Sequence, residues 1–134
     1  MKDNTEKLLQ KCGLGAQMGV NGINAAQRYA TDPELLNLLS EFKDKHRKVE
    51  EEADLLLAAR GKKGKRVNKA VKKMARAVTS VRIAEMMIRS CDSALERLAG
   101  LLSKYAQAEE PAKECVKKLV LIEQEYRIRL KNCA

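Results

Sequence analysis

Apolar and small residues recur at steps of three and four along almost the whole chain, and this spacing constrains the fold more than any other feature. A period of this kind places one apolar stripe on each segment, which is the pattern of an amphipathic helix. Four segments carry it, over residues 5–30, 34–60, 66–107 and 111–131. The sequence therefore predicts four helices.

The turns between these segments carry recognisable signals. Thr31 or Asp32 can cap the second helix, Pro33 suits its first turn, and glycines at 61 and 64 end it. The third segment is long enough that we expect a bend near residues 90–93 or at Gly100. Because short connections place consecutive helices antiparallel, we predict one all-α domain over residues 1–134, an antiparallel up-down-up-down four-helix bundle.

Composition excludes several other classes of protein. Aromatic residues make up 3% of the chain and tryptophan is absent, which disfavours an aromatic-rich β-sandwich. The longest apolar run, residues 55–59, is too short to span a bilayer, and the first residues lack the apolar stretch of a signal peptide. We therefore expect a soluble, cytoplasmic protein without a transmembrane segment. Its four cysteines form no Cys-x-x-Cys pair and are expected to be reduced thiols.

Three polar residues fall on the predicted apolar stripes: His46, Glu85 and Tyr126. Buried polar groups need hydrogen-bond partners, so a network of the three is one solution. The alternative is that His46 and Tyr126 point their polar ends at water or at a backbone carbonyl while Glu85 lies at the edge of the bundle.

Two stretches resemble the ferritin-like superfamily. Residues 21–46, NGINAAQRYATDPELLNLLSEFKDKH, look like its first hairpin with an inward histidine, and Glu123-Gln-Glu-Tyr126 resembles its last Glu-x-x-His with tyrosine in place of histidine. The resemblance implies an antiparallel four-helix bundle, and small bacterial members of unknown role are the nearest in character. Metal-binding members of the family oxidise iron or scavenge peroxide.

The metal ligands that this resemblance implies are mostly missing. Lys43 stands where the pattern needs a glutamate, and no carboxylate lies between Glu6 and Asp32. His46, Glu85 and Glu123 remain as residual candidates, where a di-iron centre needs about six ligands. We therefore expect no cofactor and a non-enzymatic binding or assembly module. The alternative is a redox protein that binds iron or another divalent metal.

The single histidine also suggests a second hypothesis, that the chain is a histidine phosphotransfer domain. The accepting histidine of that family is followed closely by Lys-Gly, whereas no glycine follows His46 until Gly61. We therefore disfavour phosphotransfer.

Basic residues concentrate in residues 60–76, which hold nine Lys and Arg and no acid, within a chain of net charge +9. Such a segment favours an anionic partner: nucleic acid, an anionic membrane surface or an acidic protein. The alternative is internal pairing with acids at 50, 51, 52 and 54. A homo-oligomer is also open. The predicted anion-binding residues are Lys62, Lys63, Lys65, Arg66, Lys69, Lys72, Lys73 and Arg76.

Overall fold

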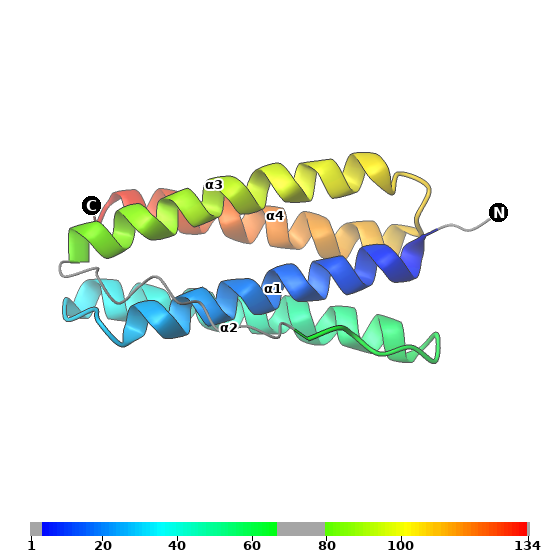
Figure 1. Cartoon of the computed structure of the whole chain (residues 1–134), viewed down its shortest axis with the longest axis horizontal. Coiled ribbons are helices and arrows are strands. Elements are labelled where there is room, and N and C mark those ends of the chain that lie inside the picture. Colours follow the sequence, from blue (N-terminus) through cyan, green and yellow to red (C-terminus); the bar gives the residue numbers. More distant parts are fainter. Residues whose placement is uncertain (1–3, 67–79, 134) are drawn as a thin grey trace.

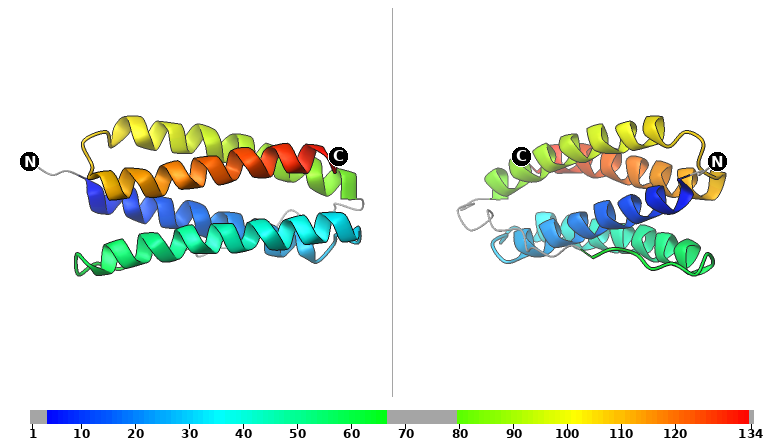
Figure 2. Two further views of the ribbon diagram at one scale, coloured as in Figure 1. Left: turned by 180° about the vertical axis from the view of Figure 1, so that it is seen from behind. Right: turned by 45° about the vertical axis from the view of Figure 1, so that its right-hand side comes forward.

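The structure is a computed structural model that describes residues 4–66 and 80–133. The described residues form four helices, α1 (Thr5–Gln27), α2 (Pro33–Ala58), α3 (Ser80–Lys104) and α4 (Glu110–Lys131). They lie side by side in two layers, α1 with α2 and α3 with α4 (Figures 1 and 2). The all-α class and the four helices are confirmed for this part of the chain. No helix in it is long and apolar enough to cross a membrane.

Helix α2 begins and ends at the predicted signals. The Asp32 side chain accepts a hydrogen bond from the Glu34 backbone N–H at 3.3 Å, and Pro33 is the first helical residue. At the other end Gly61 adopts φ 71°, and the Lys62 N–H bonds to the Leu57 carbonyl at 2.9 Å. A residue with positive φ at this position closes a helix, and glycine adopts that conformation without steric cost.

One end of the bundle is tied together by polar contacts between helix ends. The Glu109 N–H, just before α4, donates to the Thr5 hydroxyl at the start of α1 at 2.9 Å. Arg60, just after α2, pairs with Glu109 at 2.8 Å and lies 3.8 Å from Glu6. The starts of α1 and α4 and the end of α2 therefore meet at this end.

The apolar core divides into two clusters along the bundle axis. The Phe42 cluster joins the end of α1, the start of α2, the start of α3 and the end of α4; it includes Ile23, Leu35, Leu39, Phe42, Ile83, Met87, Tyr126 and Leu130. The Leu98 cluster joins the opposite ends of the same helices; it includes Leu8, Leu9, Cys12, Ala53, Leu57, Leu98, Cys115 and Leu119. All four helices contribute to both clusters, so the bundle has a core along its whole length.

The two clusters also give the direction of each helix. Helices α1 and α4 run from the Leu98 cluster to the Phe42 cluster, whereas α2 and α3 run the opposite way. The topology is therefore up-down-down-up, and the predicted up-down-up-down order is wrong. The reason lies in the connection after α2, whose described residues 59–66 are not helical and do not lead straight into a returning helix.

The described part of this connection already runs back along the bundle (Figure 1). The Gln10 side chain donates to the Lys63 carbonyl at 3.4 Å, and the Gln17 side chain donates to the Lys65 carbonyl at 2.8 Å. The later residue of the connection, Lys65, thus contacts the later residue of α1, Gln17, so the two segments run in the same direction. Residues 63–65 therefore follow α1 away from the end of α2.

The remaining boundaries differ from the prediction by a few residues, except in the third helix. Helix α1 ends at Gln27, and α3 continues without interruption through residues 90–93 and Gly100 to Lys104. Residue 66, the predicted start of the third helix, is not helical. Residues 67–79 of the predicted third helix lie outside the described residues.

Candidate functional site

A buried histidine and a buried glutamate meet near the middle of the bundle. His46 of α2 is 0% exposed and Glu123 of α4 is 6% exposed. The Nε2 atom of His46 forms a very short contact with Glu123 Oε1. On the other side of the ring, Nδ1 lies 2.6 Å from the Phe42 carbonyl oxygen. Both ring nitrogens are therefore engaged.

The hydrogen-bond partners determine how many protons this pair holds. A carbonyl oxygen can only accept, so Nδ1 of His46 carries a proton and donates it to Phe42. The contact between Nε2 and Glu123 then needs one more proton between its two atoms. The pair is either imidazolium with carboxylate or neutral imidazole with carboxylic acid. In both forms it is a closed hydrogen-bonded unit.

A glycine of α1 makes room for the histidine ring. A Cβ atom built on Gly19 would lie 2.3 Å from His46 Cδ2 and 2.7 Å from Nε2. Real side chains essentially never approach so closely, so residue 19 must lack a side chain while His46 keeps this position.

Tyr126 and Cys91 complete the buried polar site. The Tyr126 ring stacks on Phe42 with ring centroids 4.8 Å apart and meets the edge of His46 at 5.9 Å. Among the described residues its hydroxyl is the one buried side-chain N or O atom without a hydrogen-bond partner. Burial raises the pKa of this phenol well above its ordinary value, and the nearby Cys91 and Glu123 add to that rise.

Cys91 brings a thiol from α3 to the same site. It is 1% exposed. Burial and the neighbouring Glu123 carboxylate raise the pKa of the thiol far above the ordinary range. The site therefore contains groups from α1, α2, α3 and α4, and each titratable side chain in it is shielded from solvent.

Glu85 does not belong to this site. The sequence placed it on a buried stripe between Val81 and Ile88, but its side chain is exposed. The core-facing residues of this part of α3 are Ile83, Ala84, Met87 and Cys91. The predicted network of His46, Glu85 and Tyr126 is therefore corrected to His46 with Glu123, beside Tyr126 and Cys91.

These residues do not fit a di-iron centre of the ferritin-like kind. Such a centre takes carboxylates from all four helices together with two histidines. Here His46 and Glu123 bond to each other, and Lys43, one turn before His46, donates to Gln27 at 3.1 Å. Within residues 4–66 and 80–133, no group of three or more His, Cys, Asp or Glu side chains is arranged to hold a metal ion.

The described part of the basic segment divides into paired and exposed residues. Arg66 pairs with Glu50 at 2.8 Å and lies 3.8 Å from Asp54, so internal pairing with the acids of α2 occurs at this residue. The remaining lysines of residues 60–66 are exposed: Lys62, Lys63 and Lys65. The other predicted anion-binding residues, Lys69, Lys72, Lys73 and Arg76, lie outside the described residues.

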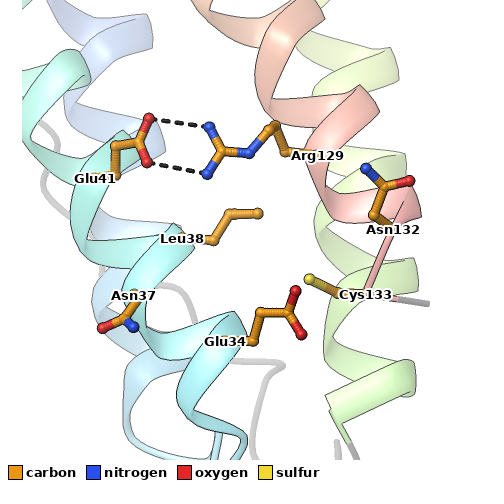
Figure 3. Close-up of a pocket in the computed structure, with 7 residues that line it drawn as sticks. All are labelled: Glu34, Asn37, Leu38, Glu41, Arg129, Asn132 and Cys133. Atoms are coloured by element: carbon orange, nitrogen blue, oxygen red, sulfur yellow. Dashed lines mark hydrogen bonds and ion pairs between the residues drawn. The ribbon is translucent and has the colours of Figure 1, made fainter.

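Sequence reasoning missed a small cleft between the start of α2 and the end of α4 (Figure 3). It has a volume of about 200 Å³. Glu41 and Arg129 form a two-pronged ion pair at one side of it, at 3.0 and 3.1 Å. The half-buried Cys133 points into it near Glu34 (Figure 3). Only the position of these residues on two distant helices makes the cleft, so no local sequence signal marks it.

Comparisons with known proteins give no further assignment. No protein-family model matches the chain, and searches of curated proteins and of solved structures find no significant match.

Proposed function

We propose that this chain is a ferritin-like four-helix bundle that works as a binding module for an anionic partner and not as a metal enzyme. The topology supports the ferritin-like part of this proposal. Ferritin-like folds are four-helix bundles with one long crossover connection. Here α2 and α3 run in the same direction, so the chain between Ala58 and Ser80 has to join opposite ends of the bundle.

The closed polar pair in the core supports the absence of di-iron chemistry. A histidine that ligates a metal must offer a ring nitrogen lone pair. In His46 one nitrogen donates to a backbone carbonyl and the other is engaged with Glu123. The pair satisfies its own hydrogen bonds and fills the space at Gly19. Its role is to hold the helices in register.

The observation that carries the binding function is an exposed group of lysines held in place on α1. The bonds from Gln10 and Gln17 fix the backbone of residues 63 and 65 against this helix. Helix α1 has no acidic residue after Glu6. We name the exposed lysines of this region the basic face: Lys7, Lys11, Lys62, Lys63 and Lys65.

The charge of the basic face favours polyanions over small anions. Its lysines are strongly hydrated point charges on flexible side chains, which neutralise phosphates or headgroups without reading their pattern. No aromatic residue lies in residues 60–66, so bases have no stacking platform in this segment. The binding is therefore expected to be nonspecific and to weaken steeply with salt.

Binding of the full chain to duplex DNA, measured by fluorescence anisotropy over a salt series, tests the proposal. Replacing Lys62, Lys63 and Lys65 by Ser is expected to weaken binding and lower the salt-dependence slope by roughly 2 to 3 units. The matched control replaces three ion-paired lysines, Lys45, Lys113 and Lys118, by Ser and so removes the same charge. The control is expected to bind more tightly than the basic-face variant.

Two results would overturn this proposal. Equal losses in both triple variants would mean that net charge alone drives binding, and no salt-dependent binding to DNA or to anionic vesicles would remove the function. Elemental analysis of protein expressed with added iron tests the second part of the proposal, that the chain is not a metal enzyme. Two iron atoms per chain, lost on replacement of His46 by Leu, would establish the redox alternative.

A further inference from the structure

Two buried cysteines from opposite halves of the chain meet in the Leu98 cluster. Cys12 of α1 and Cys115 of α4 are both 0% exposed. Both are free thiols of this cluster, and each lies one turn before a residue of the Gly15–Leu119 contact between α1 and α4. Helices α1 and α4 run in the same direction and approach closely here, because a Cβ on Gly15 would lie 3.5 Å from Leu119 Cδ2.

A carboxylate connects this thiol pair to the surface. The Cys115 thiol donates to Glu52 Oε2 at 3.0 Å, and Lys118 Nζ lies 2.7 Å from the other oxygen of Glu52. The Glu52 side chain is 36% exposed. Glu52 therefore joins the buried Cys115 sulfur to the surface of the bundle.

The same contacts keep the resting pair in the thiol form. The adjacent Cys12 thiol, burial and the Glu52 carboxylate together raise the pKa of the Cys115 thiol far above its ordinary value. Hydrogen bonds from Lys118 and Cys115 lower the pKa of Glu52, so its negative charge persists beside the thiol. Since the thiolate is the reactive form, the pair resists oxidation until the oxidant is abundant or the site opens.

We propose that Cys12 and Cys115 form an oxidation site that a hydroperoxide converts into a disulfide linking α1 to α4. The Cys115 thiolate attacks a peroxide oxygen, the O–O bond breaks, and sulfenic acid and water form. The Cys12 thiolate then attacks the Cys115 sulfur, the S–S bond forms, and the S–O bond breaks with loss of water. Overall two thiols lose two electrons and two protons, and hydrogen peroxide is reduced to two waters.

The other two cysteines provide internal comparisons for this assignment. The sulfur of Cys91 faces Glu123 in the Phe42 cluster. Cys133 lies half-buried in the cleft at the far end of α4. Within the described residues neither has the contact that joins Cys12 to Cys115. Oxidation of Cys91 or Cys133 should therefore stop at single-sulfur products or at bonds between chains.

Mass spectrometry of the full chain after exposure to hydrogen peroxide tests the proposal. The Cys133→Ser chain, which avoids links between copies, is expected to lose about 2 Da without gaining oxygen, and peptide mapping is expected to join Cys12 to Cys115. The cross-link closes a loop of about 100 residues and is expected to raise the Tm by about 10 °C. Reduction with dithiothreitol should reverse both changes.

Matched variants separate this site from general thiol oxidation. Cys91→Ser is expected to keep the disulfide, whereas Cys12→Ser and Cys115→Ser are expected to lose it. Glu52→Gln removes the charge that opposes the thiolate and is expected to speed disulfide formation about threefold. Glu114→Gln, an exposed carboxylate on α4 paired with Lys117, is expected to leave the rate unchanged.

Several results would overturn the proposal. A disulfide mapped to any other pair, or oxygen addition to Cys12 and Cys115 without a cross-link, would show that the contact does not lead to a bond. Peptide mapping of the wild-type chain distinguishes these outcomes even if a cysteine variant fails to fold. Slower oxidation of Glu52→Gln than of Glu114→Gln would refute the restraining role of Glu52.

Discussion

The His46–Glu123 pair in the core and the Arg66–Glu50 pair on the surface both join a basic side chain to a carboxylate from another part of the chain, yet they differ in burial. The buried pair has side-chain exposures of 0% and 8%, and the surface pair has 66% and 18%. Water can replace a lost partner at the surface but not in the core. The buried pair therefore fixes helix register, whereas the surface pair only reduces local charge.

The largest expected effect comes from removing one partner of the buried pair. Glu123→Ala leaves the buried imidazole without its partner, and we expect a loss of about 3 kcal/mol in the free energy of unfolding. Urea unfolding measures it. Glu125→Ala, which removes an exposed partner of Lys45, is expected to cost less than about 1 kcal/mol.

A double replacement sharpens this comparison. Changing His46 and Glu123 together to Leu removes both polar groups, and we expect it to recover at least half of the loss caused by Glu123→Ala. A loss in Glu123→Ala no larger than that in Glu125→Ala would contradict the register role of the buried pair.

The second effect concerns the space that the buried pair needs. Gly19→Ala places a methyl group against the His46 ring and is expected to cost about 2 kcal/mol, since the ring must leave its position between Phe42 and Glu123. Gly22→Ala is the matched control, because its nearest neighbour is Met87 Cε at 3.6 Å. We expect it to be neutral or to stabilise the helix by up to about 1 kcal/mol. Thermal unfolding of both variants compares them, and equal losses would exclude a special role for Gly19.

The third effect is a dependence of stability on pH at the half-exposed Glu41–Arg129 pair. The hydrogen bond from Arg129 holds the pKa of Glu41 below its ordinary value. A lowered carboxyl pKa adds stability above the unfolded pKa, and this stability is lost as pH falls through the folded pKa. Glu41→Gln is therefore expected to cost less than about 1 kcal/mol near pH 7 and to cost less near pH 3 than near pH 7. Denaturant midpoints of the wild type and of Glu41→Gln at both pH values test this prediction. A difference between the two proteins that is the same at both pH values would contradict the predicted loss of stability on acidification.

The smallest effect is expected at the surface pair. Arg66→Ser breaks contacts with Glu50 and Asp54 but leaves all three residues hydrated, so we expect a change of about 0.5 kcal/mol that disappears at high salt. Urea unfolding at low and high salt measures it. A larger, salt-independent loss would mean that the basic segment is part of the folded core.

Local signals in the sequence predicted the elements well because each depends on a few adjacent residues. Asp32 and Pro33 began α2 and Gly61 ended it at the expected places. The direction of α3 depends on where a long connection leads, and no residue between 59 and 66 encodes that by itself. The bonds from Gln10 and Gln17 that reveal its path span 53 and 48 residues.

The candidate site was predicted in part for a similar reason. His46 lies on the stripe of Phe42 and Val49, which is buried along its whole length. Glu85 was assigned from Val81 and Ile88, but those apolar residues form a half-exposed flank of α3, one to three positions away from the true core stripe. The spacing of apolar residues identifies an apolar stripe on a helix, but it does not show whether that stripe faces the core or lies on the partly exposed flank. The partner of His46 lies 77 residues away, and only the packed bundle identifies it.

The crossover between α2 and α3 also affects how the chain reaches its native state. Each hairpin, α1 with α2 and α3 with α4, closes through a connection of five residues, 28–32 and 105–109. Contacts within a hairpin are close in sequence and form quickly, whereas those of α1 and α2 with α4 join residues far apart. We therefore expect docking of the two hairpins to be the slow step of folding. His46 of one hairpin and Glu123 of the other meet only in that step, so we expect the pair whose loss costs most at equilibrium to contribute mainly to the rate at which the finished bundle comes apart.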